Sequence, residues 1–201
     1  MTFCKAINLI CKAKIFYYWR VYFMNEVIKT ERLIIDKFEK NDWKDLHEYL
    51  SNEDVVQFEP YDLYTEEQAL QEAERRAENA AFWAVRLKET KKLIGNIYLE
   101  KGHFDTWELG YVFNKEYWGN YYATESAFAV VDYAFKVKNA RRIIAMCNPL
   151  NNSSWRLLER LGMRREGHLV QNIYFKQDSQ DTPIWCDTYE YGILKNEWLS
   201  K

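Results

Sequence analysis

The sequence predicts a single α/β domain in which strands and helices follow the order βααββ-βαβαββ. Three observations predict it: apolar residues alternate at period two in several short runs, they recur at helical spacing between those runs, and the composition is globular. Hydrophobic residues make up 48% and charged residues 29% of the 201 residues, with only 7 Gly and 3 Pro. This composition excludes a disordered, collagen-like or linker-rich protein.

The first part of the domain is predicted to hold one strand and two helices. The strand covers residues 31–38 and the first helix residues 42–50. Thr65 and Gln68 form a capping-box pattern at the start of the second helix. The connection between the two helices, residues 55–61, is aromatic and acidic. A loop of this composition could line a pocket.

A strand over residues 107–113 is the best patterned of the later elements. Its aromatic and aliphatic side chains alternate with Glu108, Gly110 and Val112, and a run at helical spacing follows to about residue 138. The remaining elements are predicted to be strands over residues 81–87, 93–101, 141–147, 163–175 and 184–194, and a helix over residues 151–161.

The N-terminal segment, residues 1–26, differs from the predicted domain, residues 27–201. Its first 25 residues carry four basic residues and no acidic one: Lys5, Lys12, Lys14 and Arg20. Two interpretations are open: an unstructured extension upstream of a true start at Met24, or a basic and aromatic surface anchor. The basic residues interrupt any signal-peptide core, and no apolar run approaches the ~20 residues of a membrane span.

The charge of the chain indicates the kind of partner. Without those four residues, the 28 basic residues become 24 against 30 acidic ones, so the rest of the chain is near −6. A mildly acidic body favours a cationic or amine partner over nucleic acid. The four cysteines have no CxxC or Cys/His ligand spacing, so we expect no metal site, and Cys147 and Cys186 suit a reducing cytoplasm.

The loop from Asn114 to Glu125 is the most informative stretch of the chain. It contains Gly119 and joins the best-patterned strand directly to a helix. The first amides of a helix have no partner within the helix, and the helix dipole favours negative charge beside them. The loop is therefore predicted to bind an anion such as a pyrophosphate.

Three segments together resemble the GNAT family of acetyl-CoA-dependent N-acetyltransferases, particularly the branch of ribosomal-protein N-terminal alanine acetyltransferases. They are residues 30–34 (TERLI), 110–125 and 148–163, in the family's order and at domain-scale spacing. The resemblance implies a mixed, mostly antiparallel sheet of about six to seven strands, with a splay between two parallel strands and about four flanking helices. It also implies acetyl-CoA as the acetyl donor and an amine as the acceptor.

The resemblance assigns residues to the cofactor. It implies that the pantetheine arm pairs with the strand edge at Tyr111, Val112 and Phe113, as an added peptide strand would. It also implies that Asn151 and Ser154 face the thioester. The pyrophosphate is then expected at the backbone amides of Trp118, Gly119, Asn120, Tyr121, Tyr122, Ala123 and Thr124.

Two residues of the loop depart from the family pattern. Glu116 stands where the family has Gln or Arg, and Tyr121 stands where it has Gly or Ala. Tyrosine adopts positive φ less easily than glycine and adds bulk beside the phosphates. These departures motivate an alternative function, a non-catalytic acyl-CoA-binding or sensor domain.

Candidate catalytic groups follow from the needs of acetyl transfer. The amides of Val112 and Phe113 could stabilise the oxyanion, as the resemblance suggests. Ser154 is the first candidate to protonate the thiolate, with Tyr121 or Tyr122 as the second. Asn151 and Ser154 could also simply cap a helix. Glu108 is the candidate base, because it shares a strand face with Gly110 and Val112; a solvated surface carboxylate is the other interpretation.

The acceptor is predicted to be a protein N-terminus or a small-molecule amine. An α-amine with a pKa near ~7.8 needs about 1 kcal/mol to become neutral at pH 7, whereas a lysine-like amine near ~10.4 needs roughly 4 to 5 kcal/mol. The sequence has no clear base, which favours the α-amine. Glu59, Asp62 and Glu108 could instead recognise a polyamine or an aminoglycoside. A monomer or a homodimer is expected.

Overall fold

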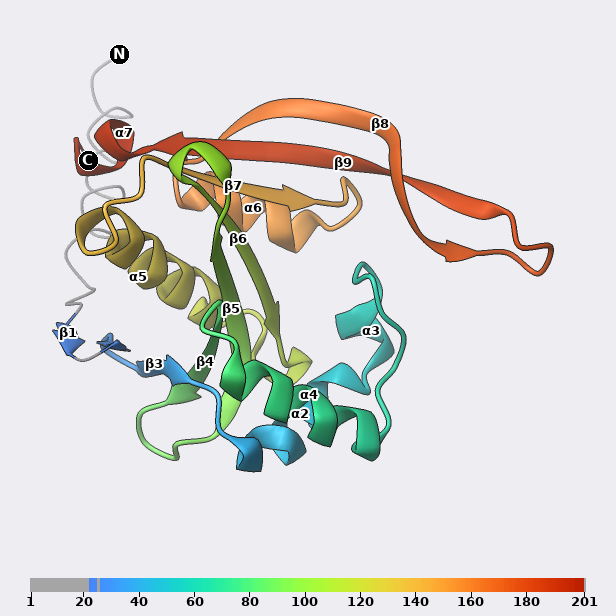
Figure 1. The fold of residues 1–201 in the computed structure, drawn as a ribbon, viewed down its shortest axis with the longest axis horizontal. Helices are drawn as coiled ribbons and strands as arrows, with labels where there is room; N and C mark the ends of the chain where they lie inside the picture. The colour runs from blue at the N-terminus through green and yellow to red at the C-terminus, as the bar shows by residue number, and fades with distance from the viewer. Residues whose placement is uncertain (1–21, 25, 201) are drawn as a thin grey trace, which may run out of the picture.

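The computed structural model of the chain describes residues 22–24 and 26–200 (Figure 1). The strands of its sheet are β1 (Tyr22–Met24), β2 (Val27–Lys29), β3 (Leu33–Lys37), β4 (Phe82–Leu87), β5 (Leu93–Lys101), β6 (Thr106–Phe113), β7 (Arg142–Cys147), β8 (Arg164–Gln177) and β9 (Pro183–Leu194). The α-helices are α2 (Trp43–Leu50), α3 (Glu53–Val56), α4 (Glu66–Glu78), α5 (Tyr122–Lys136), α6 (Asn152–Arg160) and α7 (Lys195–Leu199). The short 3₁₀ helices are η1 (Lys40–Asp42), η2 (His103–Asp105) and η3 (Lys115–Tyr117).

The sheet is mixed and mostly antiparallel, with the order β1-β2-β3-β4-β5-β6-β7-β9-β8. Among the described strands, only β6 and β7 run parallel, and they pair over three residues each, ending at Glu108 and Ile144. Beyond this point β6 stays paired with β5 as far as Phe113, while β7 stays paired with β9 as far as Cys147. The two strands therefore separate, which confirms the predicted splay in a mixed sheet.

The sheet has nine strands, two more than the upper end of the prediction. The additional strands are β1 and β2, of three residues each, which pair with each other at the edge beside β3. Three residues carry too little alternation to predict a strand. Part of the predicted N-terminal extension, residues 22–24, thus belongs to the sheet. Residues 1–21, and with them most of the proposed anchor, lie outside the described residues.

Helices cover both faces of the sheet and create two hydrophobic cores (Figure 1). On one face α5, α6 and α7 pack over the strands, with Phe135 and Leu158 fully buried. On the other face α2, α3 and α4 form a smaller core around Leu46. Strand β4 serves both, because Val85 faces the first core and its neighbour Ala84 faces the second. The two cores hold the splayed end of β6 in place from both sides.

Strands β8 and β9 form a hairpin arm, residues 164–194, whose outer half projects beyond the rest of the sheet (Figure 1). An ion pair of 3.6 Å between Lys176 and Asp62 links the arm to the loop that follows α3. The arm therefore borders the α3 side of the splay. No helix in the described part of the chain is long and apolar enough to cross a membrane.

Candidate active site

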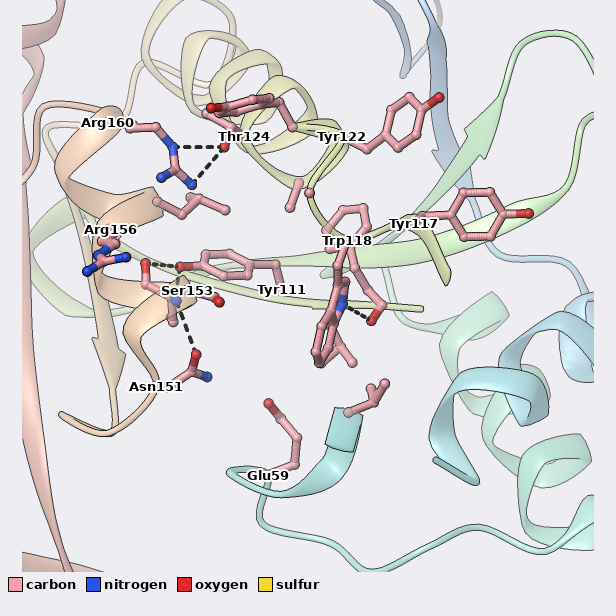
Figure 2. Close-up of a pocket in the computed structure, with 18 residues that line it drawn as sticks. Glu59, Tyr111, Tyr117, Trp118, Tyr122, Thr124, Asn151, Ser153, Arg156 and Arg160 are labelled. Atoms are coloured by element: carbon pink, nitrogen blue, oxygen red, sulfur yellow. Dashed lines mark hydrogen bonds between the residues drawn. The ribbon is translucent and has the colours of Figure 1, made fainter. Parts of the chain in front are cut away.

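A cleft of about 350 Å³ opens where β6 leaves β7 (Figure 2). Its walls come from β6, from the loop and first turn of α5, from α6, and from the segment around α3. Tyr111, Val112 and Phe113, which the sequence assigned to the pantetheine arm, all line it. Because β7 has left this part of β6, the β6 backbone edge there is open to a ligand amide. The indole Nε1 of Trp118 donates to the Phe113 carbonyl oxygen at 2.9 Å and ends that open edge.

The N-terminus of α5 forms the second wall of the cleft. The first hydrogen bond of the helix runs from Glu125 N to Tyr121 O at 2.9 Å, so the three amides before Glu125 lack an acceptor within the helix. Gly119 and Tyr121 both have positive φ, 77° and 62°, which turns the chain sharply into the helix. The predicted residues Trp118, Gly119, Tyr121, Tyr122, Ala123 and Thr124 all line the cleft. This arrangement suits an anion such as a pyrophosphate.

Two arginines of α6 add positive charge to the cleft, and the sequence analysis did not select them. Arg160 donates through Nε and Nη2 to Thr124 Oγ1 at 3.3 and 3.2 Å, which places its guanidinium beside the start of α5. Arg156 lines the cleft one helical turn earlier. Their spacing of four residues puts both on one helix face. This spacing is the feature of the sequence from which the two arginines could have been identified. A guanidinium beside open amides strengthens an anion site.

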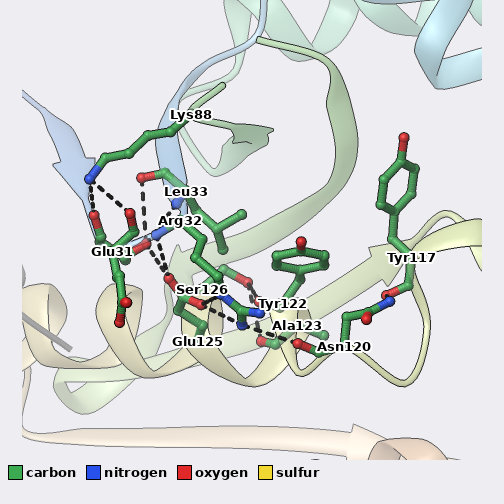
Figure 3. Close-up of polar contacts among 11 residues, drawn as sticks. Glu31, Arg32, Leu33, Lys88, Tyr117, Asn120, Tyr122, Ala123, Glu125 and Ser126 are labelled. Atoms are coloured by element: carbon green, nitrogen blue, oxygen red, sulfur yellow. Dashed lines mark hydrogen bonds and ion pairs between the residues drawn. The ribbon is translucent and has the colours of Figure 1, made fainter. Parts of the chain in front are cut away.

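An ion pair between a buried carboxylate and a partly exposed guanidinium holds the loop before α5 against the start of β3 (Figure 3). Glu125 is 0% exposed; it accepts from Thr30 Oγ1 at 2.5 Å, from Arg32 N at 3.1 Å and from Arg32 Nε at 2.8 Å. Arg32 also donates to the Asn120 carbonyl oxygen at 3.0 Å and stacks over Tyr122 at 4.3 Å. We call this set the Arg32–Glu125 latch. It gives the segment 30–34 a physical role, because the latch fixes the anion-binding loop.

Asn120, whose amide was predicted to bind the pyrophosphate, does not line the cleft, and neither does Glu116. Asn120 acts within the loop, where its side chain donates to the Trp118 carbonyl oxygen at 3.1 Å and its own carbonyl accepts from Arg32. Glu116 is exposed. The amide of Glu116 donates to Asn114 Oδ1 at 3.0 Å, which starts the short helix η3. The negative charge of Glu116 therefore lies outside the cleft lining.

The start of α6 brings a hydroxyl pair into the middle of the cleft. Asn151 caps the helix, with its Oδ1 accepting from Ser154 N at 3.1 Å. Ser154 Oγ lies 2.9 Å from the Tyr111 hydroxyl oxygen, which is also 3.1 Å from the Ser154 carbonyl oxygen (Figure 2). Burial raises the pKa of the Tyr111 hydroxyl well above its ordinary value, so it stays protonated. The partner of Ser154 is thus Tyr111, while Tyr121 and Tyr122, the second candidates for the proton donor, also line the cleft.

The structure does not bring Glu108 into the cleft. Glu108 is exposed and pairs with Glu100 of β5 and Ile144 of β7. This is the last paired position before the splay opens, so Glu108 lies at the closed end. The alternation along β6 places it on the same face as Gly110 and Val112, but the point at which two strands part cannot be read from alternation.

A different carboxylate, Glu59, lines the cleft. It lies in the loop after α3, on the opposite side of Tyr111 from Thr124 (Figure 2). Burial raises the pKa of Glu59 to about 7, against a hydrogen bond from Tyr61 that lowers it. A carboxylate with this pKa is half ionised at neutral pH. The aromatic and acidic connection predicted from the sequence thus contributes one acid to the site.

A family model described as Acetyltransferase (GNAT) domain matches residues 32–164, and the chain therefore belongs to the GNAT acetyltransferases. The uncharacterized N-acetyltransferase YnaD of Bacillus subtilis (strain 168) is 39% identical over 173 residues, which cover 85% of this chain and 98% of that protein. A GNAT-family acetyltransferase from Bacillus anthracis has a crystal structure with 39% identity and a TM-score of 0.78, covering 85% of this chain and 99% of that one.

Two more distant structures have the same fold. One is the ribosomal-protein-S5-alanine acetyltransferase of Vibrio fischeri, with 21% identity, a TM-score of 0.70, and coverage of 86% of this chain and 98% of that one. The other is the spermidine N-acetyltransferase of Vibrio cholerae in complex with CoA and spermine, with 21% identity, a TM-score of 0.70, and coverage of 84% and 98%. The predicted family is confirmed, and the chain is an N-acetyltransferase that moves an acetyl group from acetyl-CoA to an amine.

Proposed function

We propose that this enzyme transfers the acetyl group directly from acetyl-CoA to a primary amine, either a protein N-terminal α-amine or the amine of a small molecule. The observation that carries the proposal is that one cleft combines an open strand edge, the free amides of α5 and the Tyr111–Ser154 hydroxyl pair. Direct transfer needs all three around a single thioester. The two distant relatives of known acceptor act on an S5 alanine and on spermidine, and both acceptors are primary amines.

The cleft fits acetyl-CoA along its length. The pantetheine arm pairs with the β6 edge at Tyr111 and Val112, where the parting of β7 leaves backbone groups open. The pyrophosphate rests on the amides of the first turn of α5, with Arg160 beside it. The thioester then lies near the start of α6. No group of His, Cys, Asp or Glu side chains within the described residues could hold a metal ion.

The hydroxyl pair supplies the proton for the leaving thiolate. In this proposal Ser154 Oγ donates to the sulfur, and the Tyr111 hydroxyl, 2.9 Å away, replaces the proton. The backbone amides of Val112 and Phe113 stabilise the developing oxyanion. Asn151 holds the first turn of α6 in place through its bond to Ser154 N. Glu108 receives no role, because it lies outside the cleft lining.

The α-amine is the favoured acceptor on energetic grounds. Neutralising an amine of pKa near ~7.8 costs about 1 kcal/mol at pH 7, whereas a pKa near ~10.4 costs roughly 4 to 5 kcal/mol. The carboxylate in the cleft has a pKa of about 7, which matches the weaker amine better. Reaction in the cytoplasm, as a monomer or a homodimer, remains a prediction from the sequence.

An acceptor screen that records free CoA tests the proposal. Peptides with free N-termini, the same peptides with blocked N-termini, and polyamines would each be incubated with enzyme and acetyl-CoA. We expect CoA release with free N-termini or small α-amines, and mass spectrometry should find one added acetyl group. Tight acetyl-CoA binding without CoA release from any amine would contradict the proposal and favour the sensor alternative.

Ser154→Ala tests the role of the hydroxyl. We expect kcat to fall by roughly 10²-fold because the thiolate loses its proton donor, with little change in the binding of acetyl-CoA.

Asn151→Ala should lower turnover more than its stability cost explains. Thr65→Ala is the matched control, since it removes the cap of α4 outside the cleft lining. Both cap losses cost about 1 kcal/mol of stability, so equal turnover in both variants would reduce Asn151 to a helix cap.

A further inference from the structure

We propose that Glu59 binds the ammonium group of the acceptor and removes its proton, so that the enzyme selects primary amines that are cationic at neutral pH. This inference rests on the proposed function and names the acceptor subsite of the same cleft. It assigns the base of the reaction to the loop between α3 and α4, rather than to strand β6.

The position of Glu59 suits the acceptor because the two ends of the cleft differ. The open amides and Arg160 lie at the α5 end, whereas Glu59 lies beyond Tyr111 at the α3 end (Figure 2). An anionic cofactor is attracted to the first end and a cationic amine to the second. The amine then approaches the thioester from the side opposite the pyrophosphate. The backbone of Glu59 is held by a bond from its amide to the Val56 carbonyl oxygen at 3.0 Å.

The charges around Glu59 leave its carboxylate available to a ligand. The one cation that acts on its pKa among the described residues is Arg76. Arg76 is engaged elsewhere, with Glu72 at 2.7 Å and Asn96 Oδ1 at 2.9 Å. The other titratable groups facing Glu59 are the hydroxyls of Tyr61 and Tyr111, both kept protonated by burial. Glu59 is therefore a partly buried carboxylate whose direct partner is a neutral hydroxyl.

The next acid along the loop, Asp62, differs from Glu59 in its surroundings. Asp62 is exposed and forms its ion pair of 3.6 Å with Lys176 of the hairpin arm. It does not line the cleft. Asp62 thus has the same charge on the same loop without access to the reaction. This makes it a matched control for Glu59.

The proposed step balances in protons. The ionised Glu59 carboxylate takes one proton from the ammonium and later releases it to solvent. The neutral nitrogen attacks the thioester carbon, a C–N bond forms and the C–S bond breaks. The nitrogen loses a second proton to solvent through the same carboxylate, and the thiolate receives one from Ser154, which Tyr111 and then solvent restore. The products are the acetylated amine, CoA and one net proton.

Glu59→Gln tests the inference, with Asp62→Asn as the control and Glu108→Gln as the rival base. The readouts are kcat and KM for an acceptor found in the screen, from pH 5.5 to 9, and the Kd of acetyl-CoA. We expect Glu59→Gln to lower kcat/KM by about 10²-fold at pH 7. It should also remove the rise of rate with pH near 7 that ionisation of Glu59 produces. The acetyl-CoA Kd should stay within about twofold in all variants.

The outcomes separate this inference from the proposed function. If wild type acetylates amines and Glu59→Gln keeps its rate and pH profile, Glu59 is not the base and the inference is wrong while the function stands. If Glu108→Gln instead loses the pH inflection, Glu108 is the base and the inference about Glu59 is also wrong. If Glu59→Gln loses rate but keeps the inflection of its pH profile, Glu59 binds the ammonium group without removing its proton, and the proton-removal part of the inference is wrong. If wild type releases no CoA with any amine, the proposed function itself fails.

Discussion

The two ends of the cleft are built differently. At the α5 end, a short loop, a helix start and the Arg32–Glu125 latch converge, and the central carboxylate of the latch is 0% exposed. At the α3 end, the wall is the loop after a four-residue helix, bordered by the exposed hairpin arm. In our proposal the first end binds acetyl-CoA and the second end meets the acceptor amine. The acceptors named for two proteins that share this fold, a ribosomal-protein alanine and spermidine, differ from each other.

This difference indicates which end of the cleft has to be held in a fixed conformation. A pyrophosphate is bound by backbone amides, whose positions depend on how firmly the loop is held. The latch supplies that firmness from a segment about 90 residues away in the chain, since Arg32 and Glu125 differ by 93 positions. In our proposal the acceptor is recognised by individual side chains such as Glu59, so the loop that carries them can change without disturbing the loop before α5.

The largest expected effect comes from breaking the latch. Glu125→Leu leaves Arg32 without its carboxylate and removes four contacts from a fully buried position. Glu125 is fully buried while the Arg32 side chain is 39% exposed, and a hydrogen bond to a charged group typically contributes about 1.5 to 3 kcal/mol, so urea unfolding should show a loss of at least this size. Glu74→Gln is the control, because its pair with Lys40 is exposed and contributes about 0 to 1 kcal/mol. Equal losses in both variants would show that the latch is no stronger than a surface pair.

The next largest effect is on acetyl-CoA binding and concerns the α5 end of the cleft alone. Arg160→Ala removes the guanidinium beside Thr124 and the phosphate site. A hydrogen bond to a charged group contributes about 1.5 to 3 kcal/mol, so the Kd of acetyl-CoA should rise roughly 10- to 100-fold, as calorimetry would measure. The kcat at saturating acetyl-CoA should change little. Arg164→Ala, at the exposed start of β8 and outside the cleft lining, should leave the Kd unaltered.

The sequence could predict most of the residues that line the α5 end of the cleft and few of those at the α3 end. The strand, loop and helix of residues 107–138 are continuous in the chain, so their pattern indicates the anion site directly. Ser154 was found through its place in a second local segment. Its contact with Tyr111 was not, because it joins residues 43 positions apart. Glu59 is one of several acids in this part of the sequence, and only its place in the lining of the folded cleft sets it apart.

At the α3 end, the ionised carboxylate that our proposal requires for activity should lower the stability of the folded protein. Glu59 has a pKa of about 7 in the folded protein and an ordinary value of 4.5, so the folded state binds its proton more tightly. That stabilisation is complete below pH 4.5 and is lost as pH rises through 7. Glu59→Gln has no such loss, and at pH 8 it should be more stable than wild type by about 1 to 3 kcal/mol.

Thermal unfolding of both proteins at pH 5 and pH 8 measures this difference. The gain should be small at pH 5, where Glu59 is already protonated in the folded state, and should grow toward pH 8. Asp62→Asn, on the exposed part of the same loop, should show no growth with pH. A constant difference between Glu59→Gln and wild type at every pH would mean that Glu59 is not desolvated, and the contrast between the two ends would weaken.

The smallest expected effect concerns Tyr121, one of the two loop residues that depart from the family pattern. Its backbone already has the left-handed conformation that glycine favours, φ 62°, and its side chain is 63% exposed. Tyr121→Gly therefore leaves the amides of α5 in place, and the relief of strain is offset by the greater freedom of glycine in the unfolded chain. We expect the stability to change by less than about 1 kcal/mol and the Kd of acetyl-CoA by less than about threefold. Gly119→Ala, at φ 77°, provides the contrast, because it introduces strain where wild type has none. A tenfold change in Kd for Tyr121→Gly would instead show that the tyrosine ring itself contacts the cofactor.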